Sequence, residues 1–222
     1  MGYWAWPRFD LSNGHTFQDH AHTVPTASTI KVPILIEMFR AAKAGEFQWS
    51  DSITLPGDSV GGSGHLQEAL AKGPVTLTVE AMVANMIIDS DNTATNRVIA
   101  MAKLERVNRL VQELGARQTR LRRITMDTAS AAKGNENVTT PLEMARLVES
   151  IYRRKAADPA DCDAMVGIMK KVPGAIRAAV PAEIEVASKD RRFDGCAVRG
   201  GDCIWTGEAV RVECLFDVPR QG

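Results

Sequence analysis

Strand-like sequence lies at both ends of the chain, and this placement limits the possible folds more than any other feature. Residues 3–11 are rich in aromatic side chains and close at Ser12-Asn13-Gly14, a turn sequence that suits a positive φ. Residues 210–218 carry apolar side chains at every second position, which predicts a strand with one buried face. Further strands are predicted at 184–187 and 196–205. Because strands need partners, we expect the two ends to meet in one sheet.

The middle of the chain has the periodicity of amphipathic helices. Apolar residues share one helical face over 79–88 and again over 107–114, where Gly115 ends the pattern. Thr140-Pro141-Leu142-Glu143 predicts another helix start, in which the Thr140 and Glu143 side chains satisfy each other's backbone N–H groups. This helix is expected to run to about Arg154.

These patterns predict an α+β fold, with an antiparallel sheet built from the two chain ends, packed with helices, and an inserted all-helical subdomain. We expect a single domain over residues 1–222. Its sheet subdomain would comprise about residues 1–47 and 172–222, and its helical subdomain about residues 48–171. A groove between two such subdomains is a natural site for a ligand.

Composition narrows the functional classes. The 222 residues include 27 Lys and Arg and 27 Asp and Glu, so the formal net charge is zero. A neutral chain with a pI near 6.9 argues against nucleic-acid binding, which normally needs a basic surplus. No window approaches the ~18 apolar residues of a membrane span. The first residues do not resemble an export leader.

Cysteine and histidine give no sign of a metal centre. His20 and His22 share a strand face in one interpretation, but all four histidines are expected at the surface. The cysteines lack the paired spacing of a zinc site, and buried free thiols are favoured over two disulfides. We therefore expect neither a metal nor a cofactor. The four cysteines are Cys162, Cys196, Cys203 and Cys214.

The first chemical signal is Ser28-Thr29-Ile30-Lys31. If Ser28 opens a helix, Lys31 lies one turn later on the same face. Its amine can then accept the Ser28 hydroxyl proton, provided that burial or neighbours lower the lysine pKa. Backbone N–H groups at a helix start would also face a developing oxyanion. The alternative is an N-cap serine followed by a solvated lysine, because this short pattern is common by chance.

The second signal is Ser90-Asp91-Asn92, directly after the predicted helix 79–88. In a functional interpretation, Ser90 relays a proton to a leaving group and Asn92 anchors both substrate and lysine. The alternative is a helix stop followed by an N-cap, since all three residue types favour caps. The two motifs together, in this order, are far more specific than either alone.

These residues resemble the class A serine β-lactamases and related penicillin-recognising enzymes, whose Ser-x-x-Lys and Ser-Asp-Asn motifs they match. The resemblance extends from about Tyr3 to Val218. It rests on the segments 25–33 (the nucleophile), 77–96 (the second motif), 134–141 (the end of the family's Ω-loop) and 186–189 (the third motif).

The resemblance implies a role for each matching residue. Ser28 would be the acylated nucleophile, Lys31 its proton partner and Ser90 the relay. Asn92 would anchor the substrate amide, and Lys189 would bind a substrate carboxylate. The oxyanion hole would be formed by the backbone N–H of Ser28 and that of a residue two or three past Lys189. Similarity to exported enzymes implies a periplasmic or secreted protein with a small-molecule substrate.

The third motif departs from the family pattern. The family has Lys-Thr-Gly, whereas this chain has Lys189-Asp190-Arg191. Arg191 replaces a glycine where substrate backbone approaches the strand closely, so it would reshape the substrate pocket. Asp190 places a negative charge beside an anion subsite and should weaken carboxylate binding.

The Ω-loop departs as well. Thr125 stands where class A enzymes have the glutamate that activates the deacylating water. Asp127 is a candidate replacement base, with a loop-capping aspartate as the alternative, and Glu136 is expected to be a solvated turn residue. The resemblance also implies a helix at each end, for which this sequence offers no match. A trimmed chain, a partner that covers the sheet and a reduced member of the family are the alternatives.

The sequence therefore predicts a serine hydrolase of the β-lactamase type that is acylated at Ser28 by a β-lactam and deacylates slowly or differently. Two alternatives stay open: a hydrolase of another ester, amide or peptide, and a non-catalytic penicillin-binding or scaffold protein of the same fold.

Overall fold

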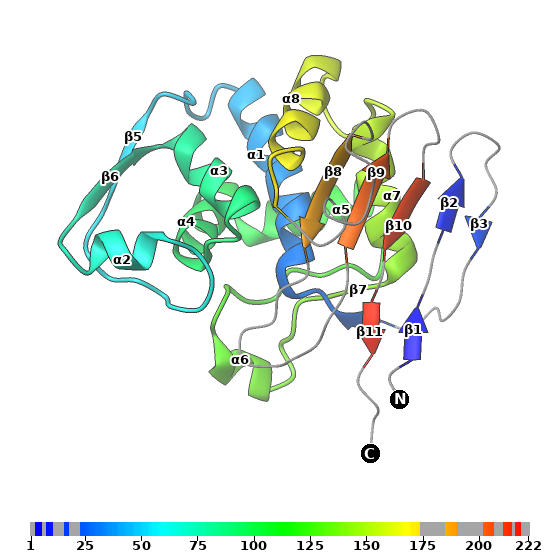
Figure 1. Ribbon diagram of the computed structural model, residues 1–222, viewed down its shortest axis with the longest axis horizontal. Coiled ribbons are helices and arrows are strands. Elements are labelled where there is room, and N and C mark those ends of the chain that lie inside the picture. The colour runs from blue at the N-terminus through cyan, green and yellow to red at the C-terminus, as the bar shows by residue number, and fades with distance from the viewer. Residues whose placement is uncertain are drawn as a thin grey trace.

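The two ends of the chain meet in an antiparallel sheet beside a group of helices (Figure 1). The computed structural model describes residues 23–173 and 185–189 with their side chains, and the remaining strand residues by backbone alone. The strands are β1 (Tyr3–Ala5), β2 (Arg8–Asp10), β3 (Thr16–Phe17), β4 (Val24–Pro25), β5 (Ser52–Leu55), β6 (Val75–Thr78), β7 (Val138–Thr139), β8 (Val186–Asp190), β9 (Asp202–Thr206), β10 (Arg211–Cys214) and β11 (Phe216–Val218).

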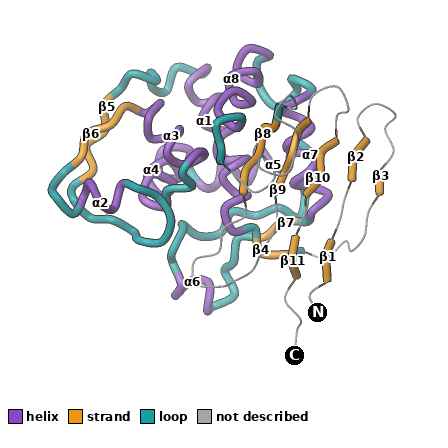
Figure 2. The backbone as a smooth tube through the Cα atoms, in the orientation of Figure 1, coloured by secondary structure: helices purple, strands orange, loops and turns teal. Residues whose placement is uncertain are grey.

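A 3₁₀ turn, η1 (Ala27–Ile30), leads into the first helix. The α-helices of the described part of the chain are α1 (Lys31–Lys43), α2 (Leu66–Leu70), α3 (Val79–Ile88), α4 (Asn92–Ala102), α5 (Leu104–Glu113), α6 (Thr128–Ala132), α7 (Pro141–Tyr152) and α8 (Pro159–Met169). The tube view shows α1, α3, α4 and α5 between the small two-stranded β5–β6 sheet and the main sheet (Figure 2). Within the described ranges, no helix combines the length and the apolar character that a bilayer span requires.

The main sheet has the strand order β3-β2-β10-β9-β8, and every neighbouring pair is antiparallel. Strand β2 pairs with β10, so Phe9 lies opposite Val212, and β1 pairs with β11 in a separate two-stranded sheet. The sheet is therefore assembled from the two chain ends, which confirms the predicted α+β class. The boundaries of the two subdomains remain a prediction.

The predicted end strands are each divided in two. The strand expected over 3–11 is β1 and β2, and the strand expected over 210–218 is β10 and β11, each half with its own partner. A period of two in the sequence does not distinguish one strand from two consecutive ones, because both halves alternate in the same way. The strands expected at 184–187 and 196–205 correspond to β8 and β9; residues 191–201 lie outside the described residues.

Helix α1 is the central element of the core. Its side chains are buried on nearly every face, from Lys31 to Ala41, and it contacts α3, α4, α5, α7 and α8. A helix that is apolar all round is stable only when other elements enclose it. Pro33 lies in the first turn, where no intrahelical hydrogen bond is lost, and Gly45, at φ +78°, closes the C-terminal end.

Helices α3, α5 and α7 confirm the sequence predictions, with one correction at α7. Thr140 accepts a hydrogen bond from the Glu143 backbone N–H at 3.2 Å, as an N-cap should. The Glu143 carboxylate does not return the bond. It accepts instead from Gln118 N at 2.8 Å and from the Thr119 hydroxyl at 2.7 Å, because this buried carboxylate faces the neighbouring chain segment. The helix ends at Tyr152, two residues before the predicted end.

The cysteine prediction is confirmed for one residue. Cys162 is a buried free thiol in α8. In the sheet, the register places Cys203 opposite Cys214 along the backbone. Cys196 lies outside the described residues.

One buried carboxylate ties α1 to α5. Glu37 is 4% exposed, and its Oε1 lies 2.7 Å from Arg106 Nη2. Burial raises the pKa of Glu37 above its ordinary value, and the Arg106 guanidinium opposes this rise. Arg106 also pairs with Glu46 at the surface. The Arg106 charge is therefore what makes an ionised Glu37 tolerable in the core.

We expect the Arg106→Gln variant to lose about 2–4 kcal/mol of unfolding free energy, at or below the loss seen when a fully buried ion pair is broken. A raised folded-state pKa means that the folded protein binds the Glu37 proton more tightly than the unfolded chain does. The contribution of Glu37 to the free energy of unfolding is therefore greatest at acidic pH, and it falls as the pH rises through the folded-state pKa. Urea unfolding at pH 5 and pH 8 should show a larger loss at pH 8.

The matched control is Glu46→Gln, which removes only the surface partner of Arg106 and should change the free energy of unfolding far less than Arg106→Gln does, because solvent screens the Glu46 charge. The double variant Glu37→Gln/Arg106→Gln should recover much of the loss, because no charge is then buried alone. Equal losses for Arg106→Gln and Glu46→Gln would contradict this account.

Candidate active site

Ser28 lies in the 3₁₀ turn that opens the central helix. It is 6% exposed, and the turn is closed by the Thr29 backbone N–H and hydroxyl, which both donate to Thr26 O, at 3.1 and 2.7 Å. Ala27 adopts a positive φ of 44°, a conformation that costs a non-glycine residue free energy. Lys31 begins α1 directly after the turn, so Ser28 lies in the 3₁₀ turn that leads into this helix and not at the first residue of the helix itself.

Ser90 joins α3 to α4 in a left-handed conformation, at φ 57°. The next residue, Asp91, is the N-cap of α4, and its carboxylate accepts from Ala94 N at 2.8 Å and from Leu66 N at 3.0 Å. A side chain at Gly64 would overlap this carboxylate, so only glycine fits there. The turn that presents Ser90 is thus held by a cap on one side and by a close backbone approach on the other.

The two motifs meet in one chain of hydrogen bonds. Lys31 Nζ donates to Ser90 Oγ at 2.9 Å, and Ser90 Oγ donates to Ser28 Oγ at 2.8 Å. Lys31 Nζ also donates to Ser90 O at 2.7 Å and to Asn92 Oδ1 at 3.4 Å. Lys31 and Ser90 are both 0% exposed. The alternative of a solvated lysine is therefore excluded, and a proton can move between Ser28 and Lys31 without entering bulk water.

Strand β8 borders the same turn. It contacts η1, and its residues Ser188 and Lys189 are 2% and 1% exposed. Lys189 is thus a buried side chain on the strand beside Ser28, where the sequence predicted an anion-binding lysine. Asp190 is described by its backbone alone. Arg191 and the second predicted oxyanion donor lie outside the described residues.

A cavity of about 190 Å³ opens beside Ser28. This volume holds several water molecules, at ~30 Å³ each, but not a whole drug-sized ligand. Among the described residues that line it, Glu136 carries the one carboxylate. The lining residues are Thr26, Ala27, Ser28, Asn92, Arg123, Thr125, Met126, Thr128, Glu136 and Asn137.

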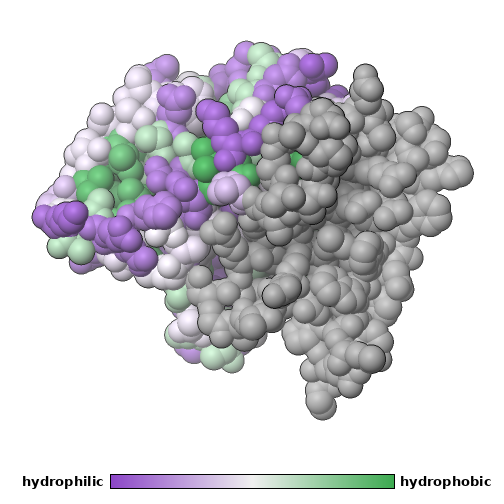
Figure 3. Space-filling view, viewed as in Figure 1, coloured by the Kyte–Doolittle hydropathy of each residue, from purple (hydrophilic) through white to green (hydrophobic). Residues whose placement is uncertain are grey.

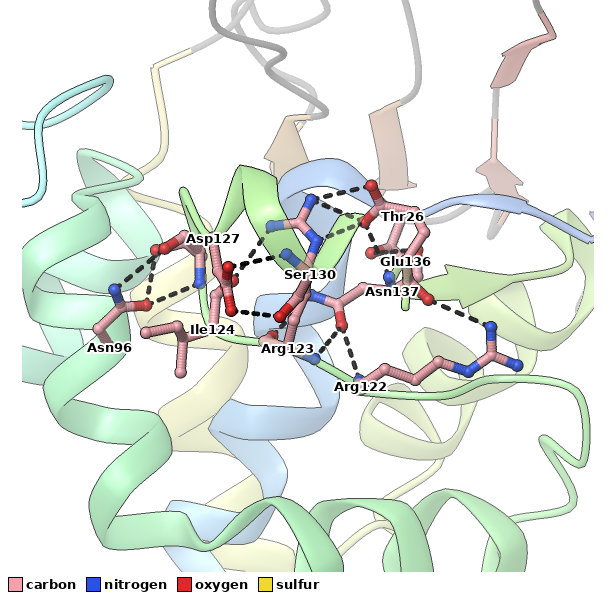
Figure 4. Close-up of polar contacts among 10 residues, drawn as sticks. Thr26, Asn96, Arg122, Arg123, Ile124, Asp127, Ser130, Glu136 and Asn137 are labelled. Atoms are coloured by element: carbon pink, nitrogen blue, oxygen red, sulfur yellow. Dashed lines mark hydrogen bonds and ion pairs between the residues drawn. The ribbon is translucent and has the colours of Figure 1, made fainter. Parts of the chain in front are cut away.

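Asn137 fastens the wall of this cavity to the nucleophile turn. Its side chain is 4% exposed; Oδ1 accepts from Arg122 N at 2.7 Å and from Arg123 N at 3.0 Å, and Nδ2 donates to Arg123 O at 3.0 Å. Its backbone O accepts from Thr26 N at 2.9 Å. One amide thus ties together both ends of residues 122–137, which we call the clasped loop, and fixes them to the residue two before Ser28 (Figure 4).

The Glu136 carboxylate is paired within the clasped loop. Arg123 Nη2 donates to both of its oxygens, at 2.7 and 2.9 Å, and Asn137 N donates to Oε1 at 2.8 Å. Figure 4 shows the Arg123 guanidinium directed at Glu136 across the loop. The prediction of a solvated turn residue was wrong, because the Glu136 side chain is only 29% exposed and lines the cavity.

Comparison with known proteins agrees with this geometry. The sequence model of the Beta-lactamase enzyme family matches residues 4–197. The chain belongs to this family. A β-lactamase from Sphaerobacter thermophilus DSM 20745 is 29% identical, over 96% of this chain and 82% of its own, with a TM-score of 0.83. A search of curated proteins finds no match.

Two further structures share the β-lactamase fold. A class A β-lactamase from Mycobacterium abscessus is 21% identical, over 99% of this chain and 86% of its own, with a TM-score of 0.84. PBP-A is 24% identical, over 96% of this chain and 80% of its own, with a TM-score of 0.81. The predicted resemblance to class A β-lactamases and penicillin-recognising enzymes is confirmed at the level of family and fold.

Within this β-lactamase family member, Thr125 is held by Asn96. Thr125 N and Oγ1 both donate to Asn96 Oδ1, at 2.8 and 2.7 Å, and Asn96 Nδ2 donates to Thr125 O at 3.1 Å. Thr125 Oγ1 also donates to Asn92 O at 3.2 Å. A threonine hydroxyl that donates its hydrogen bond to such acceptors does not act as a base at neutral pH.

Asp127 lies at the N-terminus of α6 and caps it. Its Oδ1 accepts from Ser130 N at 3.0 Å, and its Oδ2 accepts from the Ser130 hydroxyl at 2.6 Å. These hydrogen bonds, the hydroxyl's first, lower the pKa of Asp127 below its ordinary value. Asp127 is not among the described residues that line the cavity. The structure thus brings Ser28, Lys31, Ser90 and Asn92 together and leaves Asp127 at a helix cap.

Sequence reasoning missed Arg123, Glu136 and Asn137 as parts of this site. The short polar segment around Glu136 was matched to the family's Ω-loop, but no spacing in it indicated the contacts with Arg123. For metals, the described residues contain no group of three or more His, Cys, Asp or Glu placed to hold an ion. His20 and His22 lie outside the described residues.

The capping role of Asp127 predicts that Asp127→Asn changes neither acylation nor deacylation by more than about threefold, because asparagine is an equally good N-cap. Stopped-flow or mass-spectrometric rates with a chromogenic cephalosporin provide the measurement. A hundredfold slower deacylation in Asp127→Asn, with Ser130→Ala unchanged, would identify Asp127 as the base instead.

Proposed function

We propose that this protein is a serine hydrolase that forms an acyl-enzyme at Ser28 with β-lactams or related cyclic amides and deacylates slowly. The observation that supports it most is the buried hydrogen-bonded chain from Lys31 through Ser90 to Ser28, with donor–acceptor distances of 2.9 and 2.8 Å. A scaffold needs no such chain. Membership of the β-lactamase family supports a small-molecule substrate.

In the acylation step, Ser28 Oγ forms a bond to the carbonyl carbon and gives its proton to the neutral Lys31 amine. The carbonyl C–N bond then breaks, and the Ser90 hydroxyl gives a proton to the departing nitrogen. Ser90 regains a proton from Lys31, so the relay returns to its starting state. The buried position of all three groups favours this transfer, because no water competes for the protons.

Substrate recognition is assigned to two flanking residues. Asn92 lines the cavity, holds Lys31 through Oδ1 and donates from Nδ2 to Gly61 O at 3.2 Å. We assign it to the substrate amide, and Lys189 on β8 to the substrate carboxylate. Arg191 follows two residues later and would alter the shape of this subsite. A PBP-A variant has been solved as an acyl-enzyme complex with penicillin G, which supports a penicillin as the first test compound here.

Slow deacylation follows from the chemistry of the cavity walls. Hydrolysis of the acyl ester needs a base that removes a proton from water. Thr125 occupies the family's glutamate position, and its hydroxyl is spent on Asn96 and Asn92. Glu136 reaches the cavity, but its carboxylate is bound by Arg123 through both oxygens. Both oxygens of the only carboxylate among the described lining residues are therefore engaged by a guanidinium.

The location follows the family. Members of the β-lactamase family are commonly secreted or periplasmic, and we propose the same for this protein.

The first test is the intact mass of the protein after incubation with benzylpenicillin. We expect an adduct with the mass of one penicillin, which persists for hours because the cavity lacks an available base. Ser28→Ala should form no adduct, and Ser90→Ala should form it at least ~100-fold more slowly, the usual contribution of a positioned acid or base. An adduct in Ser28→Ala, or none in the unaltered protein, would overturn the proposal.

A second test restores the missing base. We expect Thr125→Glu to shorten the lifetime of the acyl-enzyme at least tenfold, since a positioned general base contributes about 10²–10⁴-fold. The matched control is Thr125→Gln, which has the same size but cannot accept the proton. If Glu and Gln at this position give equal lifetimes, loss of the base is not what slows deacylation.

A further inference from the structure

A second and larger pocket lies away from Ser28, between the C-terminal end of α7 and the face of α8. Its volume is about 680 Å³, within the range of small-molecule sites. Figure 3 shows hydrophilic side chains gathered over the part of the surface where α8 lies. The described lining residues are Tyr152, Arg153, Arg154, Lys155, Asp163, Val166, Gly167 and Lys170.

The two arginines are held in a way that leaves donors for a ligand. Arg154 donates from Nε to Asp163 at 2.9 Å, and Arg153 donates from Nε to Glu149 at 2.7 Å. Within the described part of the chain, the Nη groups of both guanidiniums make no hydrogen bond. A guanidinium fixed at Nε and open at Nη presents the planar pair of donors that suits a phosphate or carboxylate.

The charges around the pocket include three acids, each next to a base. Asp163 and Glu149 pair with Arg154 and Arg153, and Lys170 pairs with Glu185 at 2.7 Å. Lys155, an exposed residue, adds an ammonium to the lining. The pocket therefore has one positive charge in excess, together with the open guanidinium donors.

Arg154 adopts a backbone conformation that is strained for a residue with a side chain. Arg154 follows the C-cap of α7 with φ 55°, and Lys155 N closes the turn onto Ser150 O at 2.8 Å. Glycine is the usual residue at this left-handed position, because any side chain there is strained. Within the described residues, the Arg154 side chain makes a surface ion pair with Asp163, in which both side chains are 58% exposed. Strain kept at one position is typical of a residue retained for binding.

Gly167 on α8 is a second pocket residue that packing within the chain does not explain. It lies inside a helix, where glycine is less stable than alanine, yet a Cβ built on it would meet no atom within 4 Å. Packing inside the chain therefore does not require glycine. Its absent side chain widens the pocket instead, beside the apolar surfaces of Val166 and Tyr152.

We propose that this pocket binds a small phosphate monoester with an apolar or aromatic body. Two guanidiniums and the Lys155 ammonium line the pocket and together offer donors for the three oxygens of a phosphate, a better match than a carboxylate with two. Tyr152, Val166 and Gly167 line it as well and offer apolar surface for the body of the ligand. The site is separate from the Ser28 cavity and shares no lining residue with it.

The test is calorimetric titration of the unaltered protein with phenyl phosphate, inorganic phosphate and phenol. We expect saturable binding of phenyl phosphate with a Kd below about 1 mM, which weakens as salt is added. Inorganic phosphate should bind at least tenfold more weakly, and phenol not measurably. Absence of saturable phenyl phosphate binding would overturn the proposal.

Two variants localise the binding without endangering the fold. Arg154→Gly removes one guanidinium and relieves the backbone strain, and Gly167→Leu fills the pocket while favouring the helix. Each should keep or raise the melting temperature and weaken phenyl phosphate binding at least tenfold. Arg109→Gln, which removes an exposed guanidinium from α5, is the matched control and should bind as the unaltered protein does. Unchanged binding in Arg154→Gly and Gly167→Leu would place the ligand elsewhere, the Ser28 cavity included, and would refute the site.

Discussion

The buried amine of Lys31 is the constraint on which the rest of the site depends. A fully enclosed ammonium or amine is stable only when oxygen acceptors surround it. Ser90 and Asn92 supply those acceptors, and they reach Lys31 only because the α3–α4 junction turns sharply at Ser90. Asp91 and Gly64 fix that turn. The need of the Lys31 amine for acceptors thus explains the sharp turn between α3 and α4 and the close approach of the loop that contains Gly64.

The clasped loop, which forms one wall of the cavity beside Ser28, is fixed at several points. The clasped loop is joined at its two ends by Asn137 and Glu136 and is fixed to Thr26 beside the nucleophile turn. Its interior carries Thr125, tied to Asn96, and the Asp127 cap. The backbone of this cavity wall is therefore held at both ends, and the chemistry of the cavity is set by which side chains line it. The altered deacylation proposed here would need no rearrangement of the fold.

Much of this architecture follows from local sequence. The helix over 79–88 and the start of the helix after Thr140 were predicted because caps and periodicity are local signals. The proximity of Ser28, Lys31 and Ser90 could be anticipated because both motifs keep their spacing. The Arg123–Glu136 pair and the Asn137–Thr26 contact could not, since they join residues 13 and 111 positions apart through loop geometry alone. The same reason explains why Glu143 was assigned to its own helix cap and proved to bind Gln118 and Thr119 instead.

The sheet built from both ends of the chain imposes an order on folding. Strand β2 is synthesised about two hundred residues before its partner β10. During synthesis on the ribosome, β2 can pair early with the neighbouring β3, but its other edge remains without its partner until β10 emerges. Lys189 lies on β8, a strand of that late sheet. The nascent chain would thus bring Ser28, Lys31 and Ser90 together before Lys189 has its place, so the set of residues proposed here to act on a substrate would be complete only once the final strands are paired.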